Sequence, residues 1–179
     1  MAPQTSIKLT YEDYATIPDD GRRHEIIDGE HYVNPAPNIK HQTVSMRLAA
    51  ALYNFVTANS LGQVFHPRID VVLSEYDVVE PDLLFISNAR AHIITAKNIQ
   101  GAPDLIVEIL SSNRDYDERL KYRTYERAGV AEYWIIDPFD DTVTIFRRAG
   151  TRFQRIETTD TLTTPLLPGF ALSLRSLFA

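Results

Sequence analysis

The second half of the chain reads DLIVEIL at 104–110, DYDERLKYRTYERAG at 115–129 and YWII at 133–136. Short, nearly continuous apolar runs like the first and the last are typical of strands that are covered on both faces. A helix that connects two strands of one sheet makes a crossover, and crossovers join parallel strands. We therefore expect parallel strands at 104–110 and 133–136, with a helix over 115–128 that ends at Gly129.

Upstream of this unit lie two further apolar runs and one long helical pattern. Residues 64–73 and 78–86 predict an antiparallel pair, and the spacing of apolar residues predicts a helix near 40–61 that stops at Gly62. We expect all four strands to lie in one mixed sheet with helices on both faces. The expected class is α/β, in the order helix-strand-strand-strand-helix-strand.

Hairpins are expected at both flanks of this core. Asp28-Gly29 is a strong tight-turn signal inside 24–33, and Gly150 separates the strands expected at 142–146 and 153–156. A short helix is expected within 8–20, and the C-terminal residues 166–178 should pack as a strand and a terminal turn.

Composition limits the function classes. The 179 residues fit a single domain over 1–179, and the absence of cysteine excludes thiolate metal sites and a cysteine nucleophile. A net charge of −6 argues against a surface that binds nucleic acid all over. The sequence shows neither a phosphate-binding Gly-rich loop nor a G-x-S-x-G motif. Because no signal peptide and no apolar run of membrane length is visible, we expect a cytoplasmic protein without a membrane partner.

Two carboxylates interrupt apolar runs. Asp82 follows Pro81 within 78–86, and Glu108 lies within 104–110. Burying an unpaired carboxylate is costly, and a divalent metal is one way to offset the cost. The structural alternative is a strand end that faces water, or an ion pair with an arginine. For the two acids together we favour the site.

The helical pattern carries two polar stripes. Asp117, Lys121 and Tyr125 share one face, although helix physics alone favours a solvated pair over a site. Arginines at 119, 123 and 127 form a second stripe that could meet phosphates but is more simply an exposed helix face.

Three further polar residues have ordinary structural interpretations. Glu25 could face solvent in its hairpin, and His41 could be a cap or a surface residue. Asp104, in a second Pro-Asp pair, begins its strand and needs only a turn-and-cap role.

Four phrases resemble the Uma-type family of restriction-endonuclease-like proteins within the PD-(D/E)XK nuclease superfamily. The similarity covers roughly residues 8–178, and the phrases are RHEIIDGE at 23–30, VEPDL at 79–83, PDLIVEILS at 103–111 and GVAEYWIIDP at 129–138. The resemblance implies a helix–three-strand–helix–strand core, which matches the order derived above.

The resemblance also implies roles for residues. Asp82 matches the aspartate of the Pro-Asp motif and Glu108 the acid of the (D/E)XK motif, so these two would bind Mg²⁺, with Mn²⁺ as a substitute. Leu110 stands where the motif has lysine, and Lys121 on the following helix would take its place. Glu25 would be an additional acid. The implied catalytic set is Asp82, Glu108, Lys121 and Glu25.

Two functions follow from these residues. The first is a Mg²⁺-dependent endonuclease that hydrolyses phosphodiester bonds, with DNA as the expected partner and a homodimer expected by analogy with nucleases of this fold. The second is a catalytically inactive nuclease-fold module that binds nucleic acid or a partner protein. Retention of Asp82, Glu108 and Lys121 favours the first, and the net charge of −6 favours the second.

Overall fold

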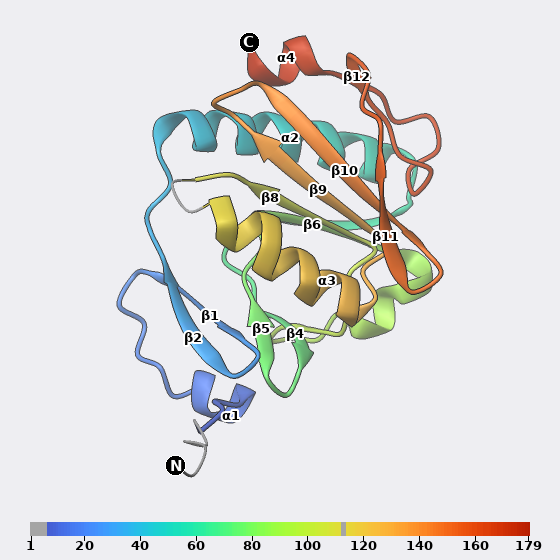
Figure 1. Cartoon of the computed structure of the whole chain (residues 1–179). Coiled ribbons are helices and arrows are strands. Elements are labelled where there is room, and N and C mark those ends of the chain that lie inside the picture. The colour runs from blue at the N-terminus through green and yellow to red at the C-terminus, as the bar shows by residue number, and fades with distance from the viewer. Residues whose placement is uncertain (1–6, 112–113) are drawn as a thin grey trace.

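The structure is a computed structural model that describes residues 7–111 and 114–179. Its largest unit is a six-stranded mixed sheet with the order β11-β10-β9-β8-β6-β3 (Figure 1). Its strands are β3 (Gly62–Phe65), β6 (Leu83–Ser87), β8 (Leu105–Ile109), β9 (Glu132–Asp137), β10 (Thr142–Ala149) and β11 (Arg152–Ile156). Strands β8 and β9 are parallel, and the other neighbouring pairs are antiparallel.

The parallel pair confirms the expected crossover. Between β8 and β9 the chain forms a π-helical turn, η2 (Tyr116–Lys121), that continues directly into α3 (Tyr122–Ala128). Gly129 follows with φ 91°, a left-handed conformation that glycine adopts without steric cost and that ends the helix. The expected helix over 115–128 is therefore confirmed, with a π-helical first half.

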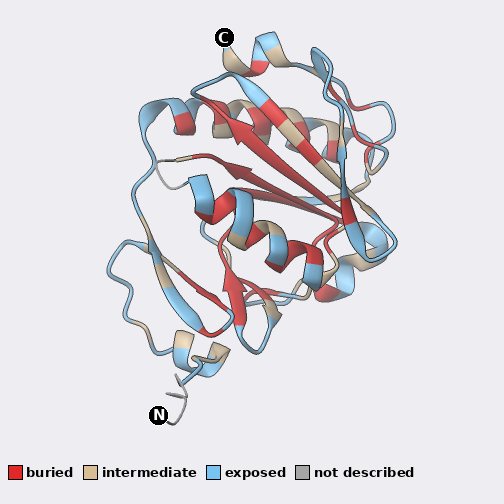
Figure 2. Cartoon of the chain, in the orientation of Figure 1, coloured by how far each residue is buried: buried red, intermediate tan, exposed pale blue. Residues whose placement is uncertain are grey.

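Helices α2 (Ile39–Ala58) and α3 cover opposite faces of this sheet (Figure 1). Along β8, Leu105, Val107 and Ile109 join the core cluster of α2, whereas Ile106 belongs to the cluster of α3. Side chains alternate between the two faces of a strand, so Glu108 points towards the α3 side. Figure 2 shows the central strands buried along their whole length.

Helix α2 begins and ends earlier than expected. The Asn38 side chain caps its first turn by accepting a hydrogen bond from the His41 backbone N–H. The helix ends at Ala58, so the expected stop at Gly62 is wrong. Gly62 instead begins β3, where an added Cβ would lie 2.1 Å from the Ile86 carbonyl oxygen. The glycine is needed for this close approach between strands and not for a helix end.

A second sheet has five strands in the order β2-β1-β5-β4-β7. They are β1 (Arg23–Ile27), β2 (Glu30–Asn34), β4 (Val71–Ser74), β5 (Asp77–Val79) and β7 (Ile99–Gln100). The remaining elements are α1 (Tyr11–Tyr14), the 3₁₀-helix η1 (Asn88–Ile93), the strand pair β12 (Thr161–Leu162) and β13 (Leu172–Ser173), and α4 (Leu174–Phe178).

The expectation of one sheet for all four apolar runs is confirmed in part: β3, β6, β8 and β9 share the six-stranded sheet, but part of the first two runs lies in the second sheet. Residues 64–73 split into β3 and β4, and residues 78–86 split into β5 and β6. The antiparallel pairing is confirmed twice, as β3 with β6 in one sheet and as β4 with β5 in the other. The physical reason is proline: Pro67 and Pro81 interrupt the two runs, and a residue without an N–H cannot continue a ladder.

The elements that flank the core agree better with the predictions from the sequence. Both hairpins are confirmed, as β1–β2 and as β10–β11. The N-terminal helix expected within 8–20 is a single turn, α1, with Thr10 as its cap. Within the described ranges, no helix combines the length and the apolar character needed to cross a membrane.

Candidate active site

Four predicted residues come from four elements that meet beside the main sheet. Glu25 lies in β1, Asp82 directly precedes β6, Glu108 lies in β8 and Lys121 ends η2. All four are buried, with exposed fractions of 0%, 2%, 1% and 1%. Charged groups this deeply buried must be paired, so their partners define what the site can do.

Lys121 is the centre of the cluster. Its Nζ lies 2.9 Å from Glu108 Oε1, 3.1 Å from Glu25 Oε1 and 3.8 Å from Asp117 Oδ1. Burial opposes the charge of the ammonium, but these three carboxylates raise the pKa of Lys121 above its ordinary value. The lysine therefore stays a cation in the interior.

Glu108 is the carboxylate that burial affects most. Lys121 and the Tyr125 hydroxyl both donate to its Oε1, from 2.9 Å and 2.5 Å. Burial raises the pKa of Glu108 to about 8, and the negative charges of Asp82, Asp117 and Glu25 act in the same direction against Lys121. Burial likewise raises the pKa of Asp117 to about 6. The cluster thus holds more negative charge than its cations neutralise.

Asp82 differs from Glu108, because the pKa of Asp82 is lowered. Its Oδ1 lies 2.6 Å from Arg23, and its Oδ2 accepts from the Ile109 backbone N–H at 2.9 Å and lies 3.1 Å from His41 Nε2. Burial opposes ionisation, but the hydrogen bond with His41 and the charge of Arg23 outweigh it and lower the pKa of Asp82 to about 2. Asp82 is therefore a fixed anion.

Glu25 is held by several donors. The Glu80 backbone N–H donates to Oε1 at 2.7 Å, and the Tyr116 hydroxyl donates to Oε2 at 2.7 Å. The Asn34 amide also donates to Oε2. Despite its burial, these donors and Lys121 lower the pKa of Glu25. Glu25 is thus a satisfied anion that anchors Lys121.

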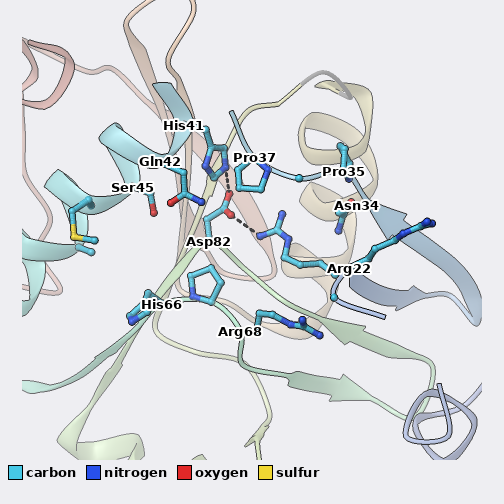
Figure 3. Close-up of a pocket in the computed structure, with 16 residues that line it drawn as sticks. Arg22, Asn34, Pro35, Pro37, His41, Gln42, Ser45, His66, Arg68 and Asp82 are labelled. Atoms are coloured by element: carbon cyan, nitrogen blue, oxygen red, sulfur yellow. Dashed lines mark hydrogen bonds and ion pairs between the residues drawn. The ribbon is translucent and has the colours of Figure 1, made fainter. Parts of the chain in front are cut away.

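Only part of this cluster opens to a cavity. A pocket of about 400 Å³ lies beside Asp82, between the start of α2, the β2–α2 loop and the segment 66–68 (Figure 3). Asp82, His41, Arg23 and Asn34 line it, whereas Glu108 and Lys121 lie behind them and are not among its lining residues.

The structure brings Glu25, Glu108 and Lys121 into direct contact and connects Asp82 to them indirectly. The link is strand pairing, since Leu83 is the register partner of Val107 and the Asp82 side chain binds the backbone of Ile109. The structural alternative is also present, because Asp82 pairs with an arginine. The arginine stripe along η2 and α3 is exposed, and Arg127 pairs with Asp28 and Asp77.

Sequence reasoning missed Arg23 and His41 as partners of Asp82. Arg23 opens the phrase RHEIIDGE, two residues before Glu25, and this alternation was a usable signal because both side chains lie on one face of β1. His41 gave no such signal, since a histidine in a first helical turn has many ordinary roles. Asp104 has the structural role expected of it, accepting from the Ser87 backbone N–H at 2.8 Å.

The donor set fits a hard divalent cation. Among residues 7–111 and 114–179, no three His, Asp or Glu side chains group closely enough to form a complete protein cage. Mg²⁺ does not need one, because it commonly binds one or two carboxylates and keeps several waters. Asp82 and Glu108 are two such carboxylates. Burial and the charges of Asp82, Asp117 and Glu25 raise the pKa of Glu108, and a cation beside it would oppose that rise.

Comparisons with known proteins give one matching family and one similar solved structure. The model of the Uma2 family, described as "Putative restriction endonuclease", matches residues 11–175. The chain is also similar to a crystal structure described as a "putative nuclease belonging to DUF820" from Anabaena variabilis, with a TM-score of 0.79 and 21% identity over 95% of this chain and 97% of that chain. At this identity the likeness shows a shared fold. No curated protein sequence matches the chain.

Proposed function

The chain belongs to the Uma2 family. From this premise we propose that it is a metal-dependent nuclease that hydrolyses phosphodiester bonds, with DNA as its substrate. The buried Lys121, held between Glu108 and Glu25, carries the proposal. Lys121 is 1% exposed, and removing it alone would leave Glu108 and Glu25 buried without their cation. A whole buried ion cluster can often be replaced by apolar residues at little cost, so the fold alone does not require these charges. A cation next to excess carboxylates is instead suited to a phosphate and an attacking water.

Asp82 and Glu108 would have different roles in binding the metal. Asp82 is ionised at every physiological pH, because its pKa is about 2, and it lies at the cavity. Glu108 lies one strand away with a pKa of about 8, so it gains most from a bound cation. Mg²⁺ held by this pair would activate a water and neutralise charge on the phosphate.

Lys121 and Arg23 supply the positive charge of the chain itself. Lys121 Nζ is within hydrogen-bond distance of Glu108 and can orient a water there, or stabilise negative charge that develops on a phosphate oxygen. Arg23 lies at the cavity beside Asp82 and can bind a phosphate oxygen when one enters. Glu25 keeps Lys121 in place.

A cleavage assay on single-stranded and duplex DNA and RNA, with and without Mg²⁺ or Mn²⁺, tests the proposal. We expect Asp82→Asn to lower the rate by about 100-fold or more, the usual scale for losing a group that stabilises the transition state. Asp104→Asn is the matched control, because Asp104 also follows a proline and is 9% exposed, but binds only the Ser87 backbone. Equal activity of the wild type and Asp82→Asn would refute the assignment.

A second candidate is binding without hydrolysis. It is favoured by the pairing of both Asp82 oxygens, with Arg23 on one side and His41 on the other. The same assay separates the two: a wild type that retains oligonucleotides but cuts none of them, with either metal, supports the second candidate.

A further inference from the structure

We infer that the cavity beside Asp82 takes one unpaired nucleotide, so that the substrate class is single-stranded nucleic acid. The inference rests on the proposed function for the identity of the polymer and deepens it by naming the form of that polymer. It begins with shape: the cavity holds about 400 Å³, within the ~300–1,000 Å³ of pockets that enclose small molecules. A stacked base pair cannot enter such a pocket, whereas an unpaired base can.

The walls suit the flat face of a base. Apolar side chains of Pro35, Pro37, Pro67, Met46 and Ala49 line the cavity. Bases bind unspecifically by stacking on apolar and aromatic surfaces, and single strands are bound in this way because their bases are free to do so. Met46 is 70% exposed, so this apolar wall continues to the surface.

Polar groups are placed where the edge of a base and the backbone would lie. Figure 3 shows Gln42 and Ser45, from α2, on one side of Asp82, with Arg22 and Arg68 on the other. An amide can donate to and accept from a base edge, and a guanidinium binds a phosphate. The cavity therefore offers partners for a base edge on one side of Asp82 and partners for a phosphate on the other side.

The charge of the cavity differs from that of the molecule. Among its lining residues Asp82 is the single carboxylate, beside Arg22, Arg23 and Arg68, although the chain as a whole carries −6. Arg23 pairs with Asp82, whereas the acids that pair with Arg22 and Arg68 lie outside the lining. Helix α2, which forms one wall, contains no acid. A local basic wall on an acidic protein attracts a polyanion to this one place.

Binding without metal tests the inference directly. In EDTA, fluorescence anisotropy with labelled oligonucleotides should give an affinity at least 10-fold higher for a single-stranded 12-mer than for a blunt duplex of the same sequence. An abasic 12-mer should bind as weakly as the duplex, because it keeps the phosphates and lacks the base. Equal affinity for the duplex, or for the abasic strand, would overturn the inference.

A variant with added negative charge locates the binding. Gln42 lines the cavity and is exposed, so Gln42→Glu should repel a polyanion there without disturbing the core and weaken single-strand binding at least 10-fold. Asn54→Asp is the matched control, because Asn54 is an exposed amide on the same helix outside the cavity. Unchanged binding by Gln42→Glu, with the wild-type melting temperature, would place the strand elsewhere and refute the inference.

The outcomes separate this inference from the proposed function. A wild type that binds single strands through the cavity but never cuts them would refute the nuclease and leave the nucleotide pocket standing. A wild type that cuts duplex DNA as fast as single strands, with Gln42→Glu equally active, would refute the nucleotide pocket and leave the nuclease standing.

Discussion

Glu108 and Asp82 lie in one cluster but have opposite relations to pH. Burial raises the pKa of Glu108 to about 8, so its ionisation opposes folding. His41 and Arg23 lower the pKa of Asp82 to about 2, so its ionisation favours folding. Each direction of pKa shift predicts how stability changes when the acid is replaced by its nearly isosteric amide.

For Glu108→Gln we expect higher stability at alkaline pH. A group whose folded pKa exceeds its unfolded value contributes stability below the unfolded value, near 4.5, and loses it as pH rises towards 8. The glutamine does not titrate, and Lys121 keeps Glu25 as a partner at 3.1 Å. Thermal midpoints between pH 5 and pH 9 should fall more for the wild type than for the variant. A variant that melts lower at every pH would mean that Glu108 serves only to pair Lys121.

For Asp82→Asn we expect the reverse. The stability that ionised Asp82 contributes is present above its unfolded pKa of 3.8 and is lost as pH falls through about 2. The shift corresponds to about 2 kcal/mol at neutral pH. Urea unfolding should therefore show Asp82→Asn less stable than the wild type at pH 7, with the difference shrinking towards pH 2. A difference independent of pH would contradict the ion pair with Arg23.

At the scale of elements, the approach of β3 to β6 depends on one glycine. An added Cβ at Gly62 would lie 2.1 Å from the Ile86 carbonyl oxygen, which is backbone and cannot rotate away. Gly62→Ala should therefore destabilise the fold by about 3 kcal/mol or more. Gly150→Ala is the control: its φ is +63° and no atom lies within 4 Å of the new Cβ, so strain of about 1 kcal/mol is expected. Similar urea midpoints for both variants would rule out the clash.

The elements also show how far sequence can predict this molecule. Periodicity placed the crossover, because β8, α3 and β9 are contiguous in the chain and each carries its own pattern. It failed where Pro67 and Pro81 divide two apolar runs between two sheets, since apolar character alone does not say which ladder a residue joins.

The site follows the same rule. Asp82 and Glu108 stood out because each is a charge inside an apolar run. Lys121 shares a helical face with Asp117 and Tyr125, but that pattern alone favoured a solvated pair, and the resemblance to the Uma-type family put Lys121 in the candidate set. Arg23 and His41 were missed as partners of Asp82, because the three lie on separate elements that only folding brings together. Charge within an element is visible in sequence, and pairing between elements is not.

At the scale of the whole molecule, the cluster couples folding to cation binding. Four carboxylates, those of Glu25, Asp82, Glu108 and Asp117, surround the cations Arg23 and Lys121. Folding buries these carboxylates and brings their charges together, and both effects raise the pKa values of Glu108 and Asp117. A divalent cation that binds the folded state alone would oppose that rise and stabilise the entire molecule.

We therefore expect millimolar Mn²⁺ to raise the thermal midpoint of the wild type, with about 2.7 kcal/mol gained when the ion is at 100 times its dissociation constant. The gain should be larger at pH 8.5 than at pH 6, because below its pKa of about 8 Glu108 is protonated and a proton competes with the ion. Glu108→Gln and Asp82→Asn should lose the gain, and Asp104→Asn should keep it, since Asp104 binds the Ser87 backbone away from the cluster. A midpoint that Mn²⁺ raises equally in all four proteins would place the ion elsewhere, because a site built by Asp82 and Glu108 cannot survive the loss of either charge unchanged.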